Sequence, residues 1–367
     1  MALTTTATAT TLEQWEKAYF REYVRESGFK QYMGESPMMP FHVKNQLIRG
    51  GQIIHIPLVM ALSGNGKGTG TLVGNEEQLI NRNYDLKPYW HRNALAVDKD
   101  EEHISAIDLL VAMREMLKVW DIDDMRDALI NALGSVVEDS GSYNKTDGHS
   151  KEVYFSEATA AEKNTFSAAN RYRLLFGVAE SNWNATFATA LATVDAAEDR
   201  LTAANVSLMK KMAKRRQRTK TGDSANVPSV RPIRTGSGGR EYFVLFTDSA
   251  NFAKLKNDST ITAANREARP RLIEENPLFQ DGDLLWDGVV IREIPEIPAT
   301  SATVSPAYLC GAQALGFAWG QMPRATQRKE DDYGFIRGVG TESLWSAEKL
   351  RYNSIDHGVV SGFFYTS

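Results

Sequence analysis

The stretch GGQIIHIPLVMALSGNGKGTGTLVG, residues 50–74, changes character in its middle and decides the predicted fold. Its first half, from Gln52 to Val59, is rich in β-branched and apolar residues and predicts a strand, with Pro57 favouring an edge position. A glycine-rich stretch runs from Ser63 to Gly70, and the residues from Tyr84 to Val97 are again typical of an extended chain. Two extended arms joined by a glycine-rich tip predict a hairpin that projects from the body.

A long helix is predicted directly after the second arm. Asp98 and Asp100 are suitable caps for its start, and apolar residues then recur at spacings of three and four as far as Trp120. The acidic segment from Asp121 to Asp124 is the place where one bend or restart would fall. The apolar spacing then continues to Gly134, a residue type that commonly ends helices.

The rest of the chain mixes strands and helices without a regular alternation. Strands are predicted at Tyr172–Phe176, Gly288–Ile291 and Gly358–Phe364, and an alanine-rich helix is predicted from Phe187 to about Gln217. The segment Glu241–Phe246 is almost entirely apolar, so we expect a strand buried on both faces. Because no βαβ repeat is present, the sequence predicts an α+β fold.

The composition is that of an ordinary globular chain. It has 367 residues, a hydrophobic fraction of 42%, and a formal net charge of -4, which requires neither a nucleic-acid nor a membrane partner. Cys310 is the only cysteine, so an intrachain disulfide is excluded and a reducing compartment is expected. No apolar run approaches the ~20 residues of a membrane helix. The Thr-rich start, Met1–Thr11, is predicted to be a flexible terminus before a short aromatic-striped helix that ends near Gly28.

No motif in the sequence predicts a catalytic, cofactor or metal site. The segment Gly64–Gly70 lacks the spacing of a phosphate-binding loop, because Lys67 is followed by Gly68 rather than by Ser or Thr. The six histidines are scattered and make no zinc motif. Cys310 stands among small and apolar residues, so we expect it to be buried rather than reactive. A large chain without converging polar residues favours a structural role, and no enzyme activity or cofactor is expected.

A basic run near residue 215 allows three interpretations. A solvated helix end is favoured, an ion-pair surface toward a neighbouring subunit comes second, and contact with nucleic acid comes third. No aromatic residue interrupts the charges, which weakens the case for base stacking. The run consists of Lys210, Lys211, Lys214, Arg215, Arg216, Arg218 and Lys220.

The order of several short motifs resembles the major capsid proteins of tailed bacteriophages with the HK97 fold, in the N4-like podophage branch. The similarity extends from about Gly50 to the end of the chain. The motifs that carry it are Ile53–Leu62 with Ser63–Gly66, Leu72–Leu79, Trp90–Ala94, Asn276–Phe279 with Trp286–Ile291, Leu309–Ala314 with Asp331–Gly334, and Asp356–Val360.

This resemblance implies a division of the chain and a function. The implied function is a major capsid protein that assembles into hexamers and pentamers of an icosahedral head around double-stranded DNA. An encapsulin-like cage of the same fold is the alternative, and a nucleotide-binding enzyme is a remote one. The implied divisions are an N-terminal arm at 1–49, an E-loop hairpin at 50–98, a P-domain with a spine helix at 99–185, an A-domain at 186–340, and a return to the P-domain at 341–367.

The resemblance also implies partners. These are other copies of the chain, a scaffolding protein, a portal protein, a decoration protein and packaged DNA that is bound without sequence specificity. No membrane partner is expected. The implied location is the virion capsid, after assembly in the host cytoplasm. Inter-subunit contacts are expected from residues of the hairpin and its returning arm, namely Lys67, Asn75, Glu76, Glu77 and Arg92.

Overall fold

A computed structural model gives the structure of most of the chain. The described residues are 29–46, 51, 53–59, 62, 68–74, 76–77, 79, 81–104, 109–138, 152–215, 227–235, 240–267, 283–328 and 333–367. The helix expected before Gly28 lies outside them, as do Lys67, Asn75, Arg216 and Arg218.

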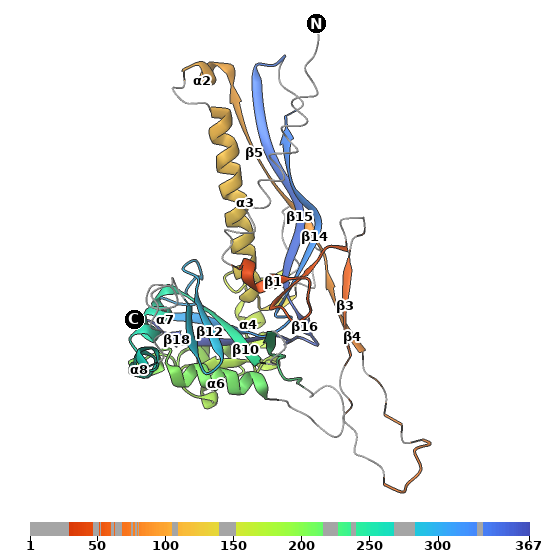
Figure 1. Ribbon diagram of the computed structural model, residues 1–367, viewed down its shortest axis with the longest axis vertical. Coiled ribbons are helices and arrows are strands. Elements are labelled where there is room, and N and C mark those ends of the chain that lie inside the picture. The colour runs from red at the N-terminus through yellow and green to blue at the C-terminus, as the bar shows by residue number, and fades with distance from the viewer. Residues whose placement is uncertain are drawn as a thin grey trace.

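The described strands form two large sheets, one elongated and one compact (Figure 1). The five-stranded sheet has the order β1-β2-β14-β15-β5 and is called the long sheet below. Its centre is the antiparallel pair β14–β15, which runs from Leu315 opposite Lys349 to Gln327 opposite Val339. Its strands are β1 (Met33–Gly34), β2 (Phe41–Lys44), β14 (Leu315–Gln327), β15 (Ile336–Lys349) and β5 (Tyr89–Asp98).

The predicted long helix lies along one face of the long sheet (Figure 1). It consists of α2 (Lys99–Ile104) and α3 (Leu109–Leu133), and Asp98 caps α2 by accepting from the Glu101 amide at 2.9 Å. The 25 residues of α3 continue through Asp121–Asp124, so no break occurs at that acidic segment. The reason is that Asp121 is buried against the sheet, where Thr341 Oγ1 donates to its carboxylate at 2.7 Å.

The seven-stranded sheet forms the second body of the molecule. Its order is β11-β12-β10-β13-β18-β8, with β9 also paired to β10; the β10–β12 and β18–β8 pairs are parallel. Its strands are β8 (Leu174–Phe176), β9 (Ile233–Thr235), β10 (Arg240–Thr247), β11 (Asp283–Trp286), β12 (Val289–Glu293), β13 (Val304–Cys310) and β18 (Val359–Tyr365).

The last part of the chain contributes to both sheets. Residues 341–349, the start of the segment expected at 341–367, belong to β15 of the long sheet, whereas β18 lies between β13 and β8 in the seven-stranded sheet. Residues 315–340 contribute β14 and the start of β15 to the long sheet. The two sheets therefore exchange strands, and neither is a continuous segment of sequence.

Helices cover both bodies. The alanine-rich segment after Phe187, expected as one helix, is divided into α5 (Phe187–Leu191), η4 (Ala197–Asp199) and α6 (Ala203–Lys214). Thr202 starts α6 anew, since its side chain accepts from the Asn205 amide at 3.4 Å. The remaining helical elements are η1 (Lys30–Tyr32), α4 (Ala160–Ala169), η3 (Glu180–Asn182), α7 (Ser249–Lys256) and α8 (Ser259–Glu267).

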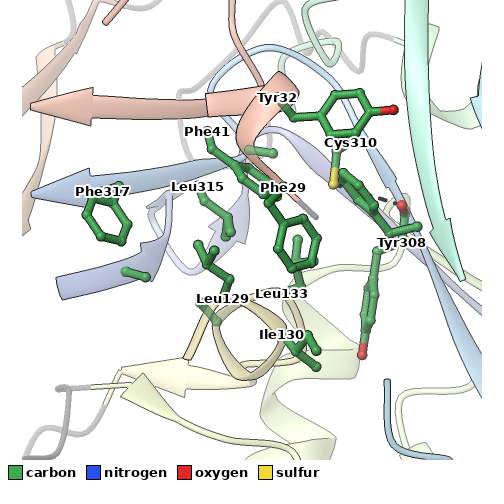
Figure 2. Close-up of a cluster of buried hydrophobic side chains, with 14 of the residues drawn as sticks. Phe29, Tyr32, Phe41, Leu129, Ile130, Leu133, Tyr308, Cys310, Leu315 and Phe317 are labelled. Carbon is green, nitrogen blue, oxygen red and sulfur yellow. Dashed lines mark hydrogen bonds between the residues drawn. The ribbon is translucent and has the colours of Figure 1, made fainter. Parts of the chain in front are cut away.

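Strand β10 lies between two cores, as its apolar sequence predicts. Val244 and Phe246 face a cluster shared with the end of α3 and the long sheet, whereas Phe243 and Leu245 face a cluster with α6 and α7. All four side chains are buried. Figure 2 shows the first cluster, in which aromatic rings from η1 and β2 meet aliphatic side chains from the end of α3. This shared core packs the long sheet against the seven-stranded body.

Cys310 belongs to the same cluster, which confirms that it is buried. Burial raises the pKa of its thiol far above the ordinary range. The thiolate form that cysteine nucleophiles require is therefore suppressed at neutral pH.

The predicted hairpin is present but shorter than expected. β3 (Ile54–Val59) pairs with β4 (Asn81–Leu86) in an antiparallel ribbon, from Ile54 opposite Leu86 to Val59 opposite Asn81. Residues 89–98, expected in the returning arm, form β5 and pair with β15 instead. Two further two-stranded pairs are β6 (Val137–Glu138) with β7 (Glu152–Val153) and β16 (Arg351–Tyr352) with β17 (Ile355–Asp356).

Candidate inter-subunit surfaces

The root of the β3–β4 hairpin is fixed to the body by apolar packing. Ile56 and Tyr84 pack with Leu350 and Tyr352 in a small buried cluster that also includes Ala318 of β14. Tyr352 Oη donates to the carbonyl oxygen of Ile56 at 3.3 Å. A two-stranded ribbon is barely stable alone. Its packing on the body therefore sets the direction in which the hairpin projects.

Beneath this root lies a cluster of buried charges. Lys349 Nζ lies 2.9 Å from Asp356 Oδ2, and Arg351 bonds both Asp356 Oδ1, at 3.1 Å, and Glu152 Oε1, at 3.2 Å. Tyr84 Oη on the hairpin also donates to Glu152 Oε1, at 3.2 Å. We call Glu152, Lys349, Arg351 and Asp356 the buried charge cluster. It connects the hairpin to both β7 and the end of the long sheet.

Burial shapes the protonation of this cluster. Burial raises the pKa of Glu152, against the opposing effect of Arg351. Burial lowers the pKa of Lys349, although the nearby Asp356 carboxylate raises it. Burial acts to lower the pKa of Arg351, but the carboxylates of Glu152 and Asp356 outweigh it and raise the pKa. The ionised forms therefore depend on one another.

The cluster also reaches the end of α3 and the seven-stranded body. Arg351 Nη2 donates to Ser135 Oγ at 2.5 Å, just beyond α3. Arg173 Nε, next to β8, donates to the Asp356 carbonyl oxygen at 3.2 Å, and the Asp356 amide donates to Asn170 Oδ1 at 2.8 Å. These bonds bring together segments that lie 183 to 216 residues apart in sequence.

Beyond its root, the hairpin projects away from the body (Figure 1). Its described apolar side chains are solvent-exposed, and Val73 reaches an exposed fraction of 81%. A Cβ at Gly68, Gly70 or Gly74 would meet no atom within 4 Å. Exposed apolar residues gathered on one projecting element are typical of an interaction surface. They are Val59, Leu62, Leu72, Val73 and Leu79.

The predicted hairpin contacts divide between two places. Glu76 and Glu77 are exposed on the hairpin, where Glu76 Oε2 also accepts from the Gly74 amide at 2.7 Å. Arg92, expected beside them on the returning arm, lies in β5 opposite Glu342 of β15. Within one copy, the structure therefore places Arg92 in the long sheet and not on the hairpin.

The face of the long sheet opposite α3 is a second open surface. Tyr89 and His91 point toward the helix side, where His91 Nδ1 lies 2.6 Å from Asp124 Oδ2. Because side chains alternate along a strand, Trp90 and Arg92 point to the opposite face. Both are exposed, Trp90 with an exposed fraction of 44%.

The basic run, as far as the structure describes it, lines one hollow on the seven-stranded body. The hollow has a volume of about 500 Å³. Lys210 bonds Asp287 Oδ1 at 2.8 Å, and Arg215 bonds Glu180 Oε2 at 2.6 Å. The Lys210 hydrogen bond holds the pKa of Asp287 below its usual range. The lining residues are Ser207, Lys210, Lys211, Lys214, Arg215 and Asp287.

The described residues contain no group of three or more metal-ligating side chains that could hold a metal ion. No helix in the described ranges has the length and apolarity needed to cross a bilayer.

Comparison with known proteins identifies the family. A family model described as phage capsid protein matches residues 3–362. The chain belongs to the phage capsid protein family. It is therefore a structural, shell-building chain of a phage head, as the sequence motifs predicted, and the family is not one of enzymes.

Individual relatives agree with this assignment. The chain is 26% identical to the major capsid protein of Pseudomonas phage KPP25, over 95% of this chain and 93% of that protein. The capsid subunit of cyanophage Pam1 is 36% identical, with a TM-score of 0.80 and coverage of 94% and 93%. The capsid of Ralstonia phage GP4 shares the fold at 18% identity, with a TM-score of 0.65 and coverage of 92% and 91%. The HK97-like fold is thus confirmed, whereas the N4-like branch stays a prediction.

Breaking the buried charge cluster should destabilise the chain strongly. Replacing Glu152→Gln leaves Lys349 and Arg351 with one carboxylate for two buried cations, and such losses cost about 3–5 kcal/mol. The free energy of unfolding, measured by urea titration with tryptophan fluorescence, should fall by that amount. The matched control is Glu296→Gln, which removes a 3.5 Å surface pair with Arg126 and should cost less than about 1 kcal/mol. Equal effects in the two variants would contradict the role given to the cluster.

His357 should make stability depend on pH. Burial, together with the charges of Arg173 and Arg231, lowers its pKa from 6.5 to about 4. The unfolded chain then binds a proton first, so stability is full above about pH 6.5 and declines as the pH falls to about 4, by about 3 kcal/mol. His357→Gln should remove this decline. The raised pKa of Glu152 acts in the opposite direction in both proteins, so the difference between them isolates His357. Parallel pH profiles would contradict the prediction.

Proposed function

We propose that the chain is the major subunit of an icosahedral head, in which hexamers and pentamers enclose double-stranded DNA. The observation that carries this proposal is the combination of a capsid fold with a projecting hairpin whose apolar side chains find no cover within the chain's described residues. A neighbouring copy supplies such cover in a shell, and many modest contacts add up through multivalency.

The proposed acceptor for the hairpin is the open face of the long sheet in the next copy. Trp90 offers an exposed aromatic surface there, and Arg92 offers a cation. In β15, Gly340 and Gly338 lie opposite Ala94 and Ala96, so β5 and β15 carry only short side chains at this part of the face. An extended chain can lie close to such a shallow surface. The hairpin carboxylates Glu76 and Glu77 would then form ion pairs with Arg92 of the next copy. Lys67 and Asn75 would contact other polar groups of that copy.

The domain plan follows from the same proposal, with the strand exchange included. The E-loop is the β3–β4 hairpin, the P-domain combines α3 with the long sheet, and the A-domain is the seven-stranded body. Within the proposed N-terminal arm at 1–49, the described strands β1 and β2 belong to the long sheet, and η1 and β2 pack into the shared core. Further proposed partners are a scaffolding protein, a portal protein, a decoration protein and DNA held without sequence specificity. Assembly is proposed to occur in the host cytoplasm.

Removing the hairpin tip should separate folding from assembly. A variant that lacks only Gly64–Glu77 should have the same unfolding midpoint as the wild-type chain, because the deleted segment lies beyond the packed root at Ile54–Ile56. It should fail to form closed shells, because the contact with the next copy is gone. Circular dichroism during urea unfolding tests the fold, and negative-stain microscopy tests assembly beside the wild-type chain. Closed shells of normal size from the shortened chain would overturn the proposal.

A further inference from the structure

Exposed charges of opposite sign lie at the C-terminal end of α6 and in the segment before its N-terminal end. At its C-terminal end, the hollow described above holds Lys210, Lys211, Lys214 and Arg215. Two of these cations share Glu180. Lys211 Nζ lies 3.5 Å from Glu180 Oε1, and Arg215 forms an ion pair with Glu180 Oε2. The cations of the hollow therefore outnumber its nearby carboxylates.

Lys211 and Lys214 carry most of this excess. Both are exposed, and the Lys211 side chain has an exposed fraction of 67%. They lie three residues apart in α6, so they are neighbours on one helix face. Lys214 makes no ion pair with any residue in the described ranges. This end of α6 therefore presents two cations to an incoming anionic group.

A matching acidic segment precedes the N-terminal end of α6. Asp195 and Glu198 flank the start of η4, and both are exposed. Neither forms an ion pair with another residue of the described structure. The neighbouring Val194 and Asp199 are buried, which fixes the backbone of this segment to the body.

The length of α6 keeps these charges apart within one copy. Its 12 residues span about 18 Å. Figure 1 shows α6 at the edge of the seven-stranded body, where a neighbour can reach it. A domain with an acidic end and a basic end can repeat head to tail, and such heterologous contacts close into rings when the rotation allows.

We propose that the basic end of α6, at Lys211 and Lys214, binds the acidic segment Asp195–Glu198 of the next copy around a capsomer. This inference rests on the proposed function, because it requires a ring of copies. The two exposed carboxylates match the two exposed lysines in sign and number. The contact would set the direction of the ring, since only unlike ends attract.

A copy of the chain fits this hollow better than nucleic acid does. Asp287 and Glu180 already stand beside the lysines, and their carboxylates repel a continuous phosphate backbone. The lining residues include no aromatic side chain on which a base could stack. A short acidic segment needs only two such contacts, and Lys214, unlike Lys211 with Glu180 at 3.5 Å, has no carboxylate of the described residues within ion-pair distance.

The test uses two charge-reversed full-length chains and their mixture. One carries Lys211→Glu and Lys214→Glu, and the other carries Asp195→Lys and Glu198→Lys. In each chain alone both ends of α6 have the same sign, so capsomer formation should weaken by about tenfold or more in analytical ultracentrifugation. In an equimolar mixture unlike ends meet again, so association should return to within about threefold of wild type. The matched control Lys256→Glu changes an exposed lysine of α7 and should have no effect.

The mixture should also restore only some ring sizes, which a general loss of folding stability would not explain. The two chains must alternate, and only rings with an even number of copies can alternate, so hexamers should recover and pentamers should not. Failure of the mixture to recover, with both chains folded by circular dichroism, would overturn the inference.

Three other outcomes are equally decisive. Normal capsomers from the lysine-reversed chain, with loss of bound DNA, would assign the hollow to phosphate and overturn the inference. If wild type forms rings and all variants do as well, only this inference fails. If wild type forms no rings even with a scaffolding partner, the proposed function fails and this contact fails with it.

Discussion

Buried charge is the constraint on which the rest of this structure depends. Removing Lys349, Arg351, Glu152 and Asp356 from water costs several kcal/mol per ion, and only close pairing offsets that cost. The pairing occurs where β7, the end of β15, the β16–β17 pair and the segment after α3 all meet. The hairpin joins through Tyr84. A misplaced strand would leave an ion unpaired, so the cluster penalises alternative packings of these segments.

Around that point the chain separates a rigid body from a projecting element. Rings from η1 and β2 pack on Phe246 with centroid distances of 5.2–5.6 Å, and the long sheet and the seven-stranded sheet share this core. The hairpin leaves the body with a packed root and an apolar outer part that the described chain does not cover. This division suits a shell subunit, because the body keeps its shape while the hairpin and the charged ends of α6 meet neighbours.

The sequence predicted those features that depend on local pattern. The hairpin, the long helix, the doubly buried strand at Glu241–Phe246 and the closing strand all follow from periodicity and turn residues, and the structure confirms them. The family followed from short motifs in a fixed order. The open hollow at Lys210–Arg215 was visible as a basic run, although its pairing with Asp287 and Glu180 was not.

Features that depend on pairing between distant segments were not predictable. The partner of β18 is decided by register with β13 and β8, and its sequence contains nothing that distinguishes one sheet from the other. Arg92 resembled a hairpin residue because β5 follows β4 after two residues, but its pairing with β15 places it elsewhere. Glu152 stands 199 residues before Arg351, so the buried charge cluster has no local signature.

The most direct test of this account is a cryo-electron microscopy reconstruction of shells assembled from the full-length chain, with a scaffolding protein where one is required. We expect closed shells in which the β3–β4 hairpin of each copy lies over Trp90 and Arg92 of an adjacent copy. Shells in which the hairpin folds back on its own chain, or in which that face of the long sheet stays open to solvent, would contradict it.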